Sequence, residues 1–238
     1  MFFTKFFKCR IYFSIFKSFF VQKTNSTKET FGVGTLIAIP SSLPLREGII
    51  SPIALDAPVA HVLNETFEIE KGFMTTIHAF TSDQRIIDNS HKDPRRARSA
   101  SQSIVPTSTG ASKAIGEIIP SLKGKLEGVA MRVPTPNVSL VELVFCTKKD
   151  LSIEKINSAF QNFSKKQKTK VLETTQEKLV SIDFNHNPAS SIVDTTLTNV
   201  VGKNMGKISA WYDNEWGFSN RMCDIAEYIH KTLSLIHI

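Results

Sequence analysis

Two apolar, β-rich segments flank the turn sequence PTPN, and they constrain the fold more than any other feature of the chain. The segments are LEGVAMRV, residues 126–133, and VSLVELVFCT, residues 138–147. Valine and phenylalanine favour strands, whereas proline and asparagine favour turns, so this pattern predicts two strands joined by a short connection. Further β-rich segments at residues 73–80 and 207–213 predict two more strands.

Helical signals are interspersed with these strands. Ser152 is placed to cap a helix whose apolar residues recur at helical spacing, and a second apolar stripe of this kind lies near the C-terminus. The predicted helices cover residues 58–66, 111–119, 152–166 and 219–234. Between them, the polar stretch 87–108 predicts an extended surface loop. Because strands and helices do not alternate strictly, we expect an α+β fold: a mixed, largely antiparallel sheet with helices packed on one face.

The first 48 residues differ from the rest of the chain. Residues 1–22 hold eight of the 17 phenylalanines, and residues 1–48 contain seven basic and two acidic side chains. They therefore carry +5 of the formal net charge of +7, and the other 190 residues carry only +2. This distribution argues against nucleic-acid binding by the globular part. Basic residues interrupt every apolar run, so no transmembrane segment is predicted.

We accordingly divide the chain into an irregular, basic, Phe-rich extension with a linker, residues 1–48, and a folded domain, residues 49–238. The extension is compatible with an organelle presequence or a membrane-surface helix, but the absence of a clean helical stripe favours a translated gene-boundary or frameshift product. Gly32 and Gly34 form G-x-G, but the third glycine of a dinucleotide-binding loop is absent and Pro40 follows. Three scattered cysteines suit a reducing compartment, and no metal-binding spacing occurs.

Several polar residues of the folded part are candidates for chemistry. His78 ends a predicted strand beside hydroxyl groups, which suits an acid–base role, although such a histidine can also be a hydrogen-bonded core residue. Arg132 lies in an apolar strand, where it needs a phosphate, a carboxylate or an internal salt bridge. The run 107–110, TSTG, precedes a helix and can bind an anion or simply cap the helix. Asn214 lies among aromatic residues in WYDNEWG.

Four longer stretches carry a family resemblance. They are KGFMTTIHAFTSDQ, RRARSASQSIVPTSTGASKAIG, GVAMRVPTPNVS and SAWYDNEWGFSNR. In this order they closely resemble the catalytic domain of phosphorylating glyceraldehyde-3-phosphate dehydrogenase, and the resemblance runs from about residue 57 to residue 233. It implies an NAD-dependent oxidoreductase of glycolysis, cytoplasmic and homotetrameric, that acts on glyceraldehyde 3-phosphate and inorganic phosphate. Erythrose-4-phosphate dehydrogenase is a related alternative.

The resemblance implies roles for individual residues. His78 corresponds to the base that activates the nucleophilic cysteine and assists hydride transfer to NAD, and Asn214 corresponds to the residue that holds the nicotinamide carboxamide. The substrate-phosphate site corresponds to Thr81, Asp83 and Arg132. The inorganic-phosphate site corresponds to Thr109, Gly110 and one arginine, either Arg95 or Arg96. Residues from about 87 to 105 correspond to a loop that lines the cofactor pocket of a neighbouring subunit.

The chain also departs from the family pattern. The family motif S-C-T-T-N-C precedes A-P, but here ISPIALD precedes Ala57, and a count without gaps places Ser51 at the cysteine position. A serine hydroxyl is far less ionised than a thiol, and so is a weaker nucleophile. Phe218 replaces a family tyrosine, and residues 1–56 do not resemble the NAD-binding half.

These departures lead to the expectation that the chain, as written, is a truncated or inactive form of the enzyme. Cys146 and Cys223 lie in segments that match the family elsewhere, so neither replaces the nucleophile. The alternatives are a non-catalytic binding module that mixes with full-length subunits, or a gene-model fragment without a function of its own. Hydrolase chemistry by Ser51 and His78 is disfavoured, because the sequence indicates no orienting acid and no oxyanion site.

Overall fold

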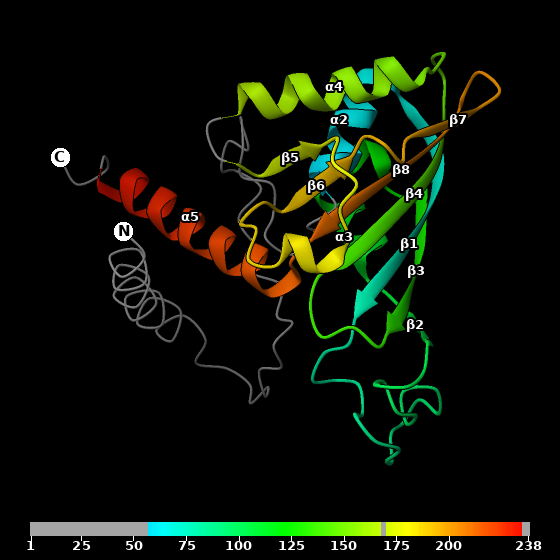
Figure 1. Ribbon diagram of the computed structural model, residues 1–238. Coiled ribbons are helices and arrows are strands. Elements are labelled where there is room, and N and C mark those ends of the chain that lie inside the picture. The colour runs from blue at the N-terminus through cyan, green and yellow to red at the C-terminus, as the bar shows by residue number, and fades with distance from the viewer. Residues whose placement is uncertain (1–56, 168–169, 235–238) are drawn as a thin grey trace. The chain divides into compact units, whose positions relative to one another are not determined.

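The computed structural model describes residues 57–167 and 170–234 (Figure 1). The described residues fall into two compact units: residues up to 218 belong to one, and residues 219–234 belong to the other. All strands of the described residues belong to the first unit. The predicted extension 1–48, the domain boundary after it and Ser51 lie outside the described residues.

Within the described residues, eight strands form one sheet in the order β2-β3-β1-β4-β8-β6-β5, and β7 pairs with β8. The strands are β1 (Ile69–Ala79), β2 (Val105–Ser108), β3 (Leu126–Val133), β4 (Ser139–Thr147), β5 (Leu172–Thr175), β6 (Ser191–Asp194), β7 (Asn199–Val201) and β8 (Met205–Tyr212). The pairs β1–β3 and β5–β6 are parallel, and the other five pairs are antiparallel. The expected mixed, largely antiparallel sheet is confirmed.

The helices of the described residues are α2 (Ala57–Phe67), α3 (Ala111–Ile118), α4 (Ile153–Lys166) and α5 (Asn214–Ser234), with short 3-10 helices η1 (Pro120–Leu122) and η2 (Ser181–Phe184). As predicted, Ser152 caps α4: its hydroxyl accepts a hydrogen bond of 3.2 Å from the backbone N–H of Lys155. Lys165 and Lys166 lie in the last turn of α4, where positive charge complements the helix dipole.

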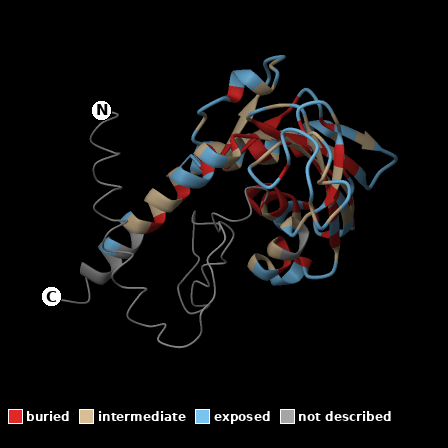
Figure 2. Cartoon of the chain, turned by 90° about the horizontal axis from the view of Figure 1, so that it is seen from below, coloured by how far each residue is buried: buried red, intermediate tan, exposed pale blue. Residues whose placement is uncertain are grey.

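The main core lies between the helices and one face of the sheet, which we call the inner face. Met74, Val141, Phe145 and Ile208 point to this face from neighbouring strands and are at most 2% exposed. They belong to one cluster with buried residues of α2, α3 and α4: Val59, Leu63, Ile115, Ile156 and Phe160 (Figure 2, red). The alternating residues of β4 are only partly buried, as expected when one sheet face is packed and the other is not.

The structure differs from the predicted elements most clearly in three places. Residues 105–108, predicted as part of a loop, form β2 because the side chains of Val105 and Thr107 are buried and the backbone pairs with β3. The final helix begins at Asn214 rather than at residue 219. The short strands β5, β6 and β7 were not predicted at all. Four-residue strands such as β6, buried along its whole length, show no alternation for sequence analysis to detect.

Candidate active site

One end of the inner face brings together His78 and Arg132. They lie on the parallel neighbours β1 and β3 and are directly opposite in the register. The Nη1 atom of Arg132 is 2.8 Å from Nδ1 of His78 and 3.1 Å from the carbonyl oxygen of Ala79. The ring of Tyr212 meets the imidazole edge-on, with centroids 6.0 Å apart. A histidine, an arginine and a tyrosine from three different strands therefore converge at this end.

Two contacts bear on the tautomer of His78. Nδ1 lies 2.6 Å from the Ala79 carbonyl oxygen, which only accepts, so this contact is a hydrogen bond when Nδ1 carries the hydrogen. Nη1 of Arg132 donates to the same oxygen and also lies 2.8 Å from Nδ1, to which it can donate only when Nδ1 is unprotonated. With the hydrogen on Nδ1 the lone pair is on Nε2, and no bond from Nε2 to another described residue is found. His78 thus presents an unprotonated ring nitrogen that can accept a proton.

The surroundings of His78 keep the imidazole neutral. The pKa of His78 is lowered from the usual 6.5 to about 4, mainly by burial and also by the positive charge of Arg132, against an opposing effect of the Ala79 carbonyl. At neutral pH the ring is therefore a base rather than a cation. Burial has a related effect on Arg132, because it lowers the pKa of the guanidinium, and Arg96 contributes in the same direction.

Arg132 retains an unused donor. Its Nε is buried and has no hydrogen-bond partner among the described residues. Buried donors of this kind are rare, because nothing compensates for the lost hydration. A guanidinium that offers its Nε and Nη edge together is suited to bind two oxygens of a phosphate or carboxylate. Within the part of the chain that the structure describes, Arg132 forms no salt bridge, and its hydrogen bonds are with His78 and Ala79.

The loop after β1 carries Thr81, Asp83 and Arg96. Arg96 forms an ion pair with the Asp83 carboxylate through Nη1. The side-chain oxygen of Gln84 accepts hydrogen bonds from the Thr81 backbone N–H, at 2.9 Å, and from the Thr81 hydroxyl, at 3.0 Å. Arg95, in contrast, is exposed. Of the two arginines between which the sequence did not decide, Arg96 is the one joined to this loop.

Thr109 and Gly110 lie at the start of α3, farther from the histidine. Val105 is opposite Arg132 in the β2–β3 ladder and Ser108 is opposite Val129, so residue 109 lies about 13 Å along the sheet from Arg132 at about 3.3 Å per residue. The Thr109 hydroxyl accepts a hydrogen bond of 3.2 Å from the N–H of Ala111. Gly110 is the N-cap residue of α3 and no side chain caps the helix there, so the Thr109 bond closes a local turn before the helix.

Asn214 is the first residue of α5 and belongs to the same end of the inner face. Its Oδ1 accepts a hydrogen bond of 3.4 Å from the hydroxyl of Ser139, at the start of β4. With Oδ1 occupied, the amide Nδ2 is left as a donor, which fits the carbonyl oxygen of a nicotinamide carboxamide. This fit concerns one end of NAD only, since the G-x-G-x-x-G loop of a dinucleotide-binding domain does not occur in the sequence.

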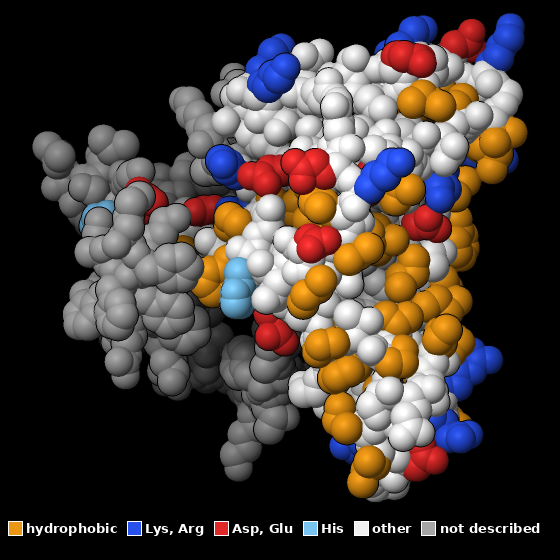
Figure 3. All heavy atoms as spheres, viewed as in Figure 1, with side chains coloured by type: hydrophobic (Ala, Val, Ile, Leu, Met, Phe, Trp, Pro, Cys, Tyr) orange, Lys and Arg blue, Asp and Glu red, His pale blue; other side chains and the backbone are white. Residues whose placement is uncertain are grey.

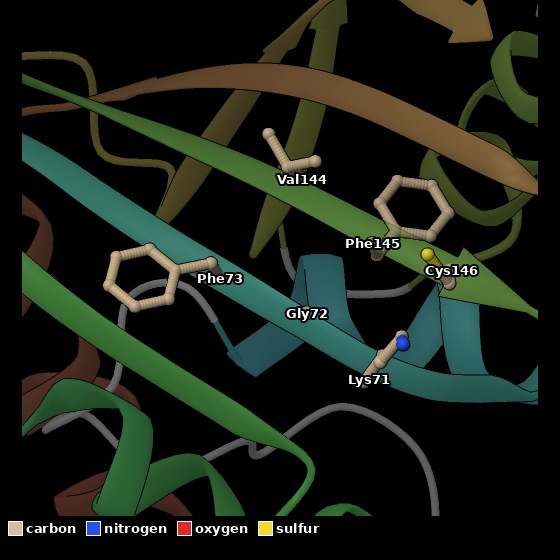
Figure 4. Close-up of a pocket in the computed structure, with 6 residues that line it drawn as sticks. All are labelled: Lys71, Gly72, Phe73, Val144, Phe145 and Cys146. Carbon is tan, nitrogen blue, oxygen red and sulfur yellow. The ribbon is translucent and has the colours of Figure 1, made fainter.

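Cys146 is far from this constellation. Cys146 lies opposite Lys71 in the β1–β4 ladder, and Lys71 precedes His78 by seven residues on β1. Cys146 and His78 are therefore about 23 Å apart along the strand direction. A pocket of about 270 Å³ lies at that remote end of the sheet, where Lys71, Phe73, Val144 and Cys146 line it with their neighbours (Figure 4). The pocket is therefore not the candidate active site, and Cys146 is not placed to act with His78. Ser51 lies outside the described residues.

The sequence analysis assigned no role to four residues of this region: Gln84, Ser139, Tyr212 and Asp213. Each acts through contacts with a residue far away in the chain or in a loop, and none stands in a recognisable spacing. The WYDNEWG motif did mark two of them as neighbours of Asn214. Among the described residues, no group of three His, Cys, Asp or Glu side chains could hold a metal ion, and no helix is long and apolar enough to cross a membrane.

Comparison with known proteins agrees with this geometry. Residues 55–214 match the family model described as glyceraldehyde 3-phosphate dehydrogenase, C-terminal domain. The chain is 54% identical over 177 residues to glyceraldehyde-3-phosphate dehydrogenase 2 of Staphylococcus aureus. These matched residues make up 74% of this chain and 51% of that protein. It is 53% identical over 176 residues to the protein of the same name from Staphylococcus epidermidis, with the same shares covered. The chain thus spans about half the length of these relatives, and it belongs to the glyceraldehyde-3-phosphate dehydrogenase family.

Proposed function

We propose that the end of the inner face is the substrate site of a phosphorylating, NAD-dependent glyceraldehyde-3-phosphate dehydrogenase. The observation that carries this proposal is the buried, unpaired Nε of Arg132 beside a neutral histidine. An arginine with a free edge suits the phosphate of glyceraldehyde 3-phosphate, and a neutral imidazole next to it suits proton transfer at the other end of a small substrate. Phosphate binding by Arg132 and proton transfer by His78 would then take place on the adjacent strands β3 and β1.

In this proposal Arg132 holds the substrate phosphate, together with Thr81 and with Asp83 through its ion pair with Arg96. Thr109 and Gly110 hold inorganic phosphate at the start of α3, where backbone N–H groups and the helix dipole favour an anion. His78 accepts a proton at Nε2, because the Ala79 carbonyl occupies the hydrogen on Nδ1. Arg96 is preferred over Arg95 for its contact with Asp83.

Bound NAD would supply the hydride acceptor of the reaction. Within this chain, Asn214 would hold the carboxamide of the nicotinamide through its Nδ2 donor. Phe218, on the first turns of the same helix and 38% exposed, offers no hydroxyl where the family has a tyrosine. The dinucleotide would thus be held at its nicotinamide end by fewer contacts than the family resemblance alone implies.

We further propose that the chain as written does not turn over its substrate. Ser51 occupies the position of the nucleophilic cysteine, and its hydroxyl is ionised far less than a thiol at neutral pH. Pro52 follows, where it removes a backbone N–H and a hydroxyl that the family motif supplies. Either change weakens attack on the aldehyde carbon.

The test is NAD reduction, followed by absorbance, with glyceraldehyde 3-phosphate and phosphate as substrates. The purified chain should be silent, and Ser51→Cys should be assayed beside it. Reduction of NAD by the unmodified chain would overturn the proposed inactivity. If only Ser51→Cys is active, the nucleophile alone is limiting; if both are silent, contacts to the cofactor are limiting as well. Erythrose 4-phosphate in place of the triose phosphate tests the related specificity.

A second candidate function, as a module that joins full-length subunits, is favoured by one observation. The connection between β1 and β2, at the bottom of Figure 1, exposes three large apolar side chains: Ile86 (52%), Ile87 (74%) and Ile104 (67%). The same region of Figure 3 shows hydrophobic side chains on the surface beside charged ones. Large apolar side chains that are exposed on one connecting segment favour an interaction surface. Co-purification with an intact homologue, lost in an Ile87→Asp variant, would support this function.

A further inference from the structure

The hydroxyl of Ser139 connects the histidine-bearing strand to Asn214. Ser139 is the first residue of β4 and is 1% exposed. Its Oγ accepts a hydrogen bond of 3.1 Å from the backbone N–H of Ala79, the residue after His78. The same Oγ donates to Oδ1 of Asn214 at 3.4 Å. One buried hydroxyl thus joins two positions that are separated by more than 130 residues in the chain.

The hydrogen bond to Ala79 replaces a missing rung of the sheet. The β1–β4 ladder ends at the pair Ile77 and Leu140, and two residues further its register would bring Ala79 opposite Val138. Val138 instead has a φ of 63°, in the left-handed region that β-branched residues rarely adopt. This turn of the backbone ends the ladder and leaves the Ala79 N–H to the Ser139 hydroxyl.

The strained residue is firmly held, and both of its neighbours reach the start of α5. Val138 is 2% exposed and packs in a small second core with Phe184 and Ile192. Asn137 donates through Nδ2 to the Asp213 carboxylate at 2.9 Å, while Ser139 reaches Asn214. Backbone strain persists where its surroundings determine it, and it is frequent at functional sites.

Asp213 fixes the backbone from which the Asn214 side chain projects. Its carboxylate, 1% exposed, accepts hydrogen bonds from the backbone N–H of Trp216, at 2.9 Å, and from that of His186, at 2.8 Å. The first of these caps α5. With the helix start held by Asp213, the Ser139 hydroxyl is the contact that sets the rotation of the Asn214 carboxamide itself.

We propose that Ser139 is a positioning residue that orients the Asn214 carboxamide relative to His78. In this orientation Asn214 offers Nδ2 as a hydrogen-bond donor, and it therefore selects a ligand group that has a carbonyl oxygen. The inference rests on the proposed function for its ligand, the carboxamide of nicotinamide. Ser139 is not among the site residues that the family resemblance implies, and its hydrogen bond explains why Asn214 presents a donor to the ligand. An amide that could rotate freely would accept donors and acceptors alike.

The test uses the full chain, labelled with 15N, and three variants. Ser139→Ala removes the hydroxyl, and Ser139→Thr retains one. The matched control is Ser209→Ala: this hydroxyl is also fully buried and donates at 3.4 Å, but to Glu142 on the opposite sheet face. The readouts are the hydrogen-exchange rate of the Ala79 amide, the side-chain amide signals of Asn214, and the response of those signals to nicotinamide.

In Ser139→Ala the Ala79 amide should exchange about tenfold faster, as expected for loss of one hydrogen bond, and the Asn214 amide signals should move towards those of a freely rotating amide. Ser139→Thr should restore both, and Ser209→Ala should change neither. The inference is overturned if Ser139→Ala leaves both signals unchanged, or if Ser209→Ala changes them equally. Should the variants fail to fold, the unmodified chain decides: an Ala79 amide that exchanges as fast as an exposed loop amide contradicts the inference.

Nicotinamide separates this inference from the proposed function. In the unmodified chain, millimolar nicotinamide should shift the Nδ2 signals of Asn214, and Ser139→Ala should weaken that response several-fold. If nicotinamide produces no shift while the exchange results are as expected, the cofactor assignment fails and the positioning by Ser139 stands. If nicotinamide shifts Asn214 equally in both proteins, the positioning role is refuted and the cofactor assignment stands.

Discussion

Acid should destabilise the chain through His78, and a variant can isolate that contribution. The unfolded chain binds a proton at the histidine with the usual pKa of 6.5, whereas burial and Arg132 lower the folded pKa to about 4. Between these values the unfolded state binds more protons than the folded state, so stability falls as the pH falls. The contribution of neutral His78 is complete above pH 6.5 and is lost on approaching pH 4.

The magnitude follows from the two pKa values. A difference of about 2.5 pH units corresponds to about 3 kcal/mol of unfolding free energy, at about 1.4 kcal/mol per unit. About 2 kcal/mol of this falls between pH 7.5 and pH 5, a range in which comparison is practical. His78→Gln retains a polar side chain of similar size but does not titrate, so its stability lacks this term.

Urea unfolding of both proteins at pH 7.5, 6 and 5 measures the effect as a difference of differences. Other titrating groups cancel, because both proteins contain them. Relative to His78→Gln, the unmodified chain should lose about 2 kcal/mol over this range, and the imidazole signals of His78 should not titrate above pH 5. A difference that stays constant with pH, or a titration of His78 near 6.5, would refute the reasoning about its environment.

Three stability predictions test the packing. Phe160→Ala, at a fully buried position, should cost about 3–5 kcal/mol in urea unfolding, and a cost below about 1 kcal/mol would contradict its place in the core. Gly72→Ala should cost about 1–3 kcal/mol of unfolding free energy, because the added Cβ would lie 2.9 Å from the carbonyl oxygen of Val144. The control Gly110→Ala, whose Cβ would have nothing within 4 Å, should change stability by less than about 0.5 kcal/mol. Equal effects of the two substitutions would contradict this reasoning. Asp213→Ala should cost at least about 2 kcal/mol, since it leaves buried donors unpaired, and unchanged thermal unfolding would argue against its role as a cap.

The longer elements could be predicted because their signals are local. The capping serine before α4 and the apolar spacing at Ile156 and Phe160 are visible in the sequence, and both residues are buried as expected. Ile153, in the first turn of α4, has the same spacing but is 40% exposed. The strand that carries His78 was also predicted, but it begins four residues earlier, at Ile69.

The site could be predicted only in part, and for a physical reason. His78 and Arg132 stand out as polar residues in apolar strands, yet their contact depends on the parallel register of β1 and β3. The bridge from Ala79 through Ser139 to Asn214 depends on the backbone conformation of Val138, and no sequence rule places a valine in the left-handed region. Residue types indicated which groups could react, whereas the sheet register determined which of them meet.

The most direct test of the account is whether the site at the end of the inner face binds a phosphate-bearing substrate. Calorimetric titration of the full chain with glyceraldehyde 3-phosphate measures this without turnover, beside Arg132→Gln and the remote control Lys71→Gln. The account predicts saturable binding by the unmodified chain and by Lys71→Gln, and loss of at least tenfold in affinity in Arg132→Gln. Equal affinity in all three proteins, or binding lost only in Lys71→Gln, would contradict the central claim that Arg132 holds the substrate phosphate beside His78.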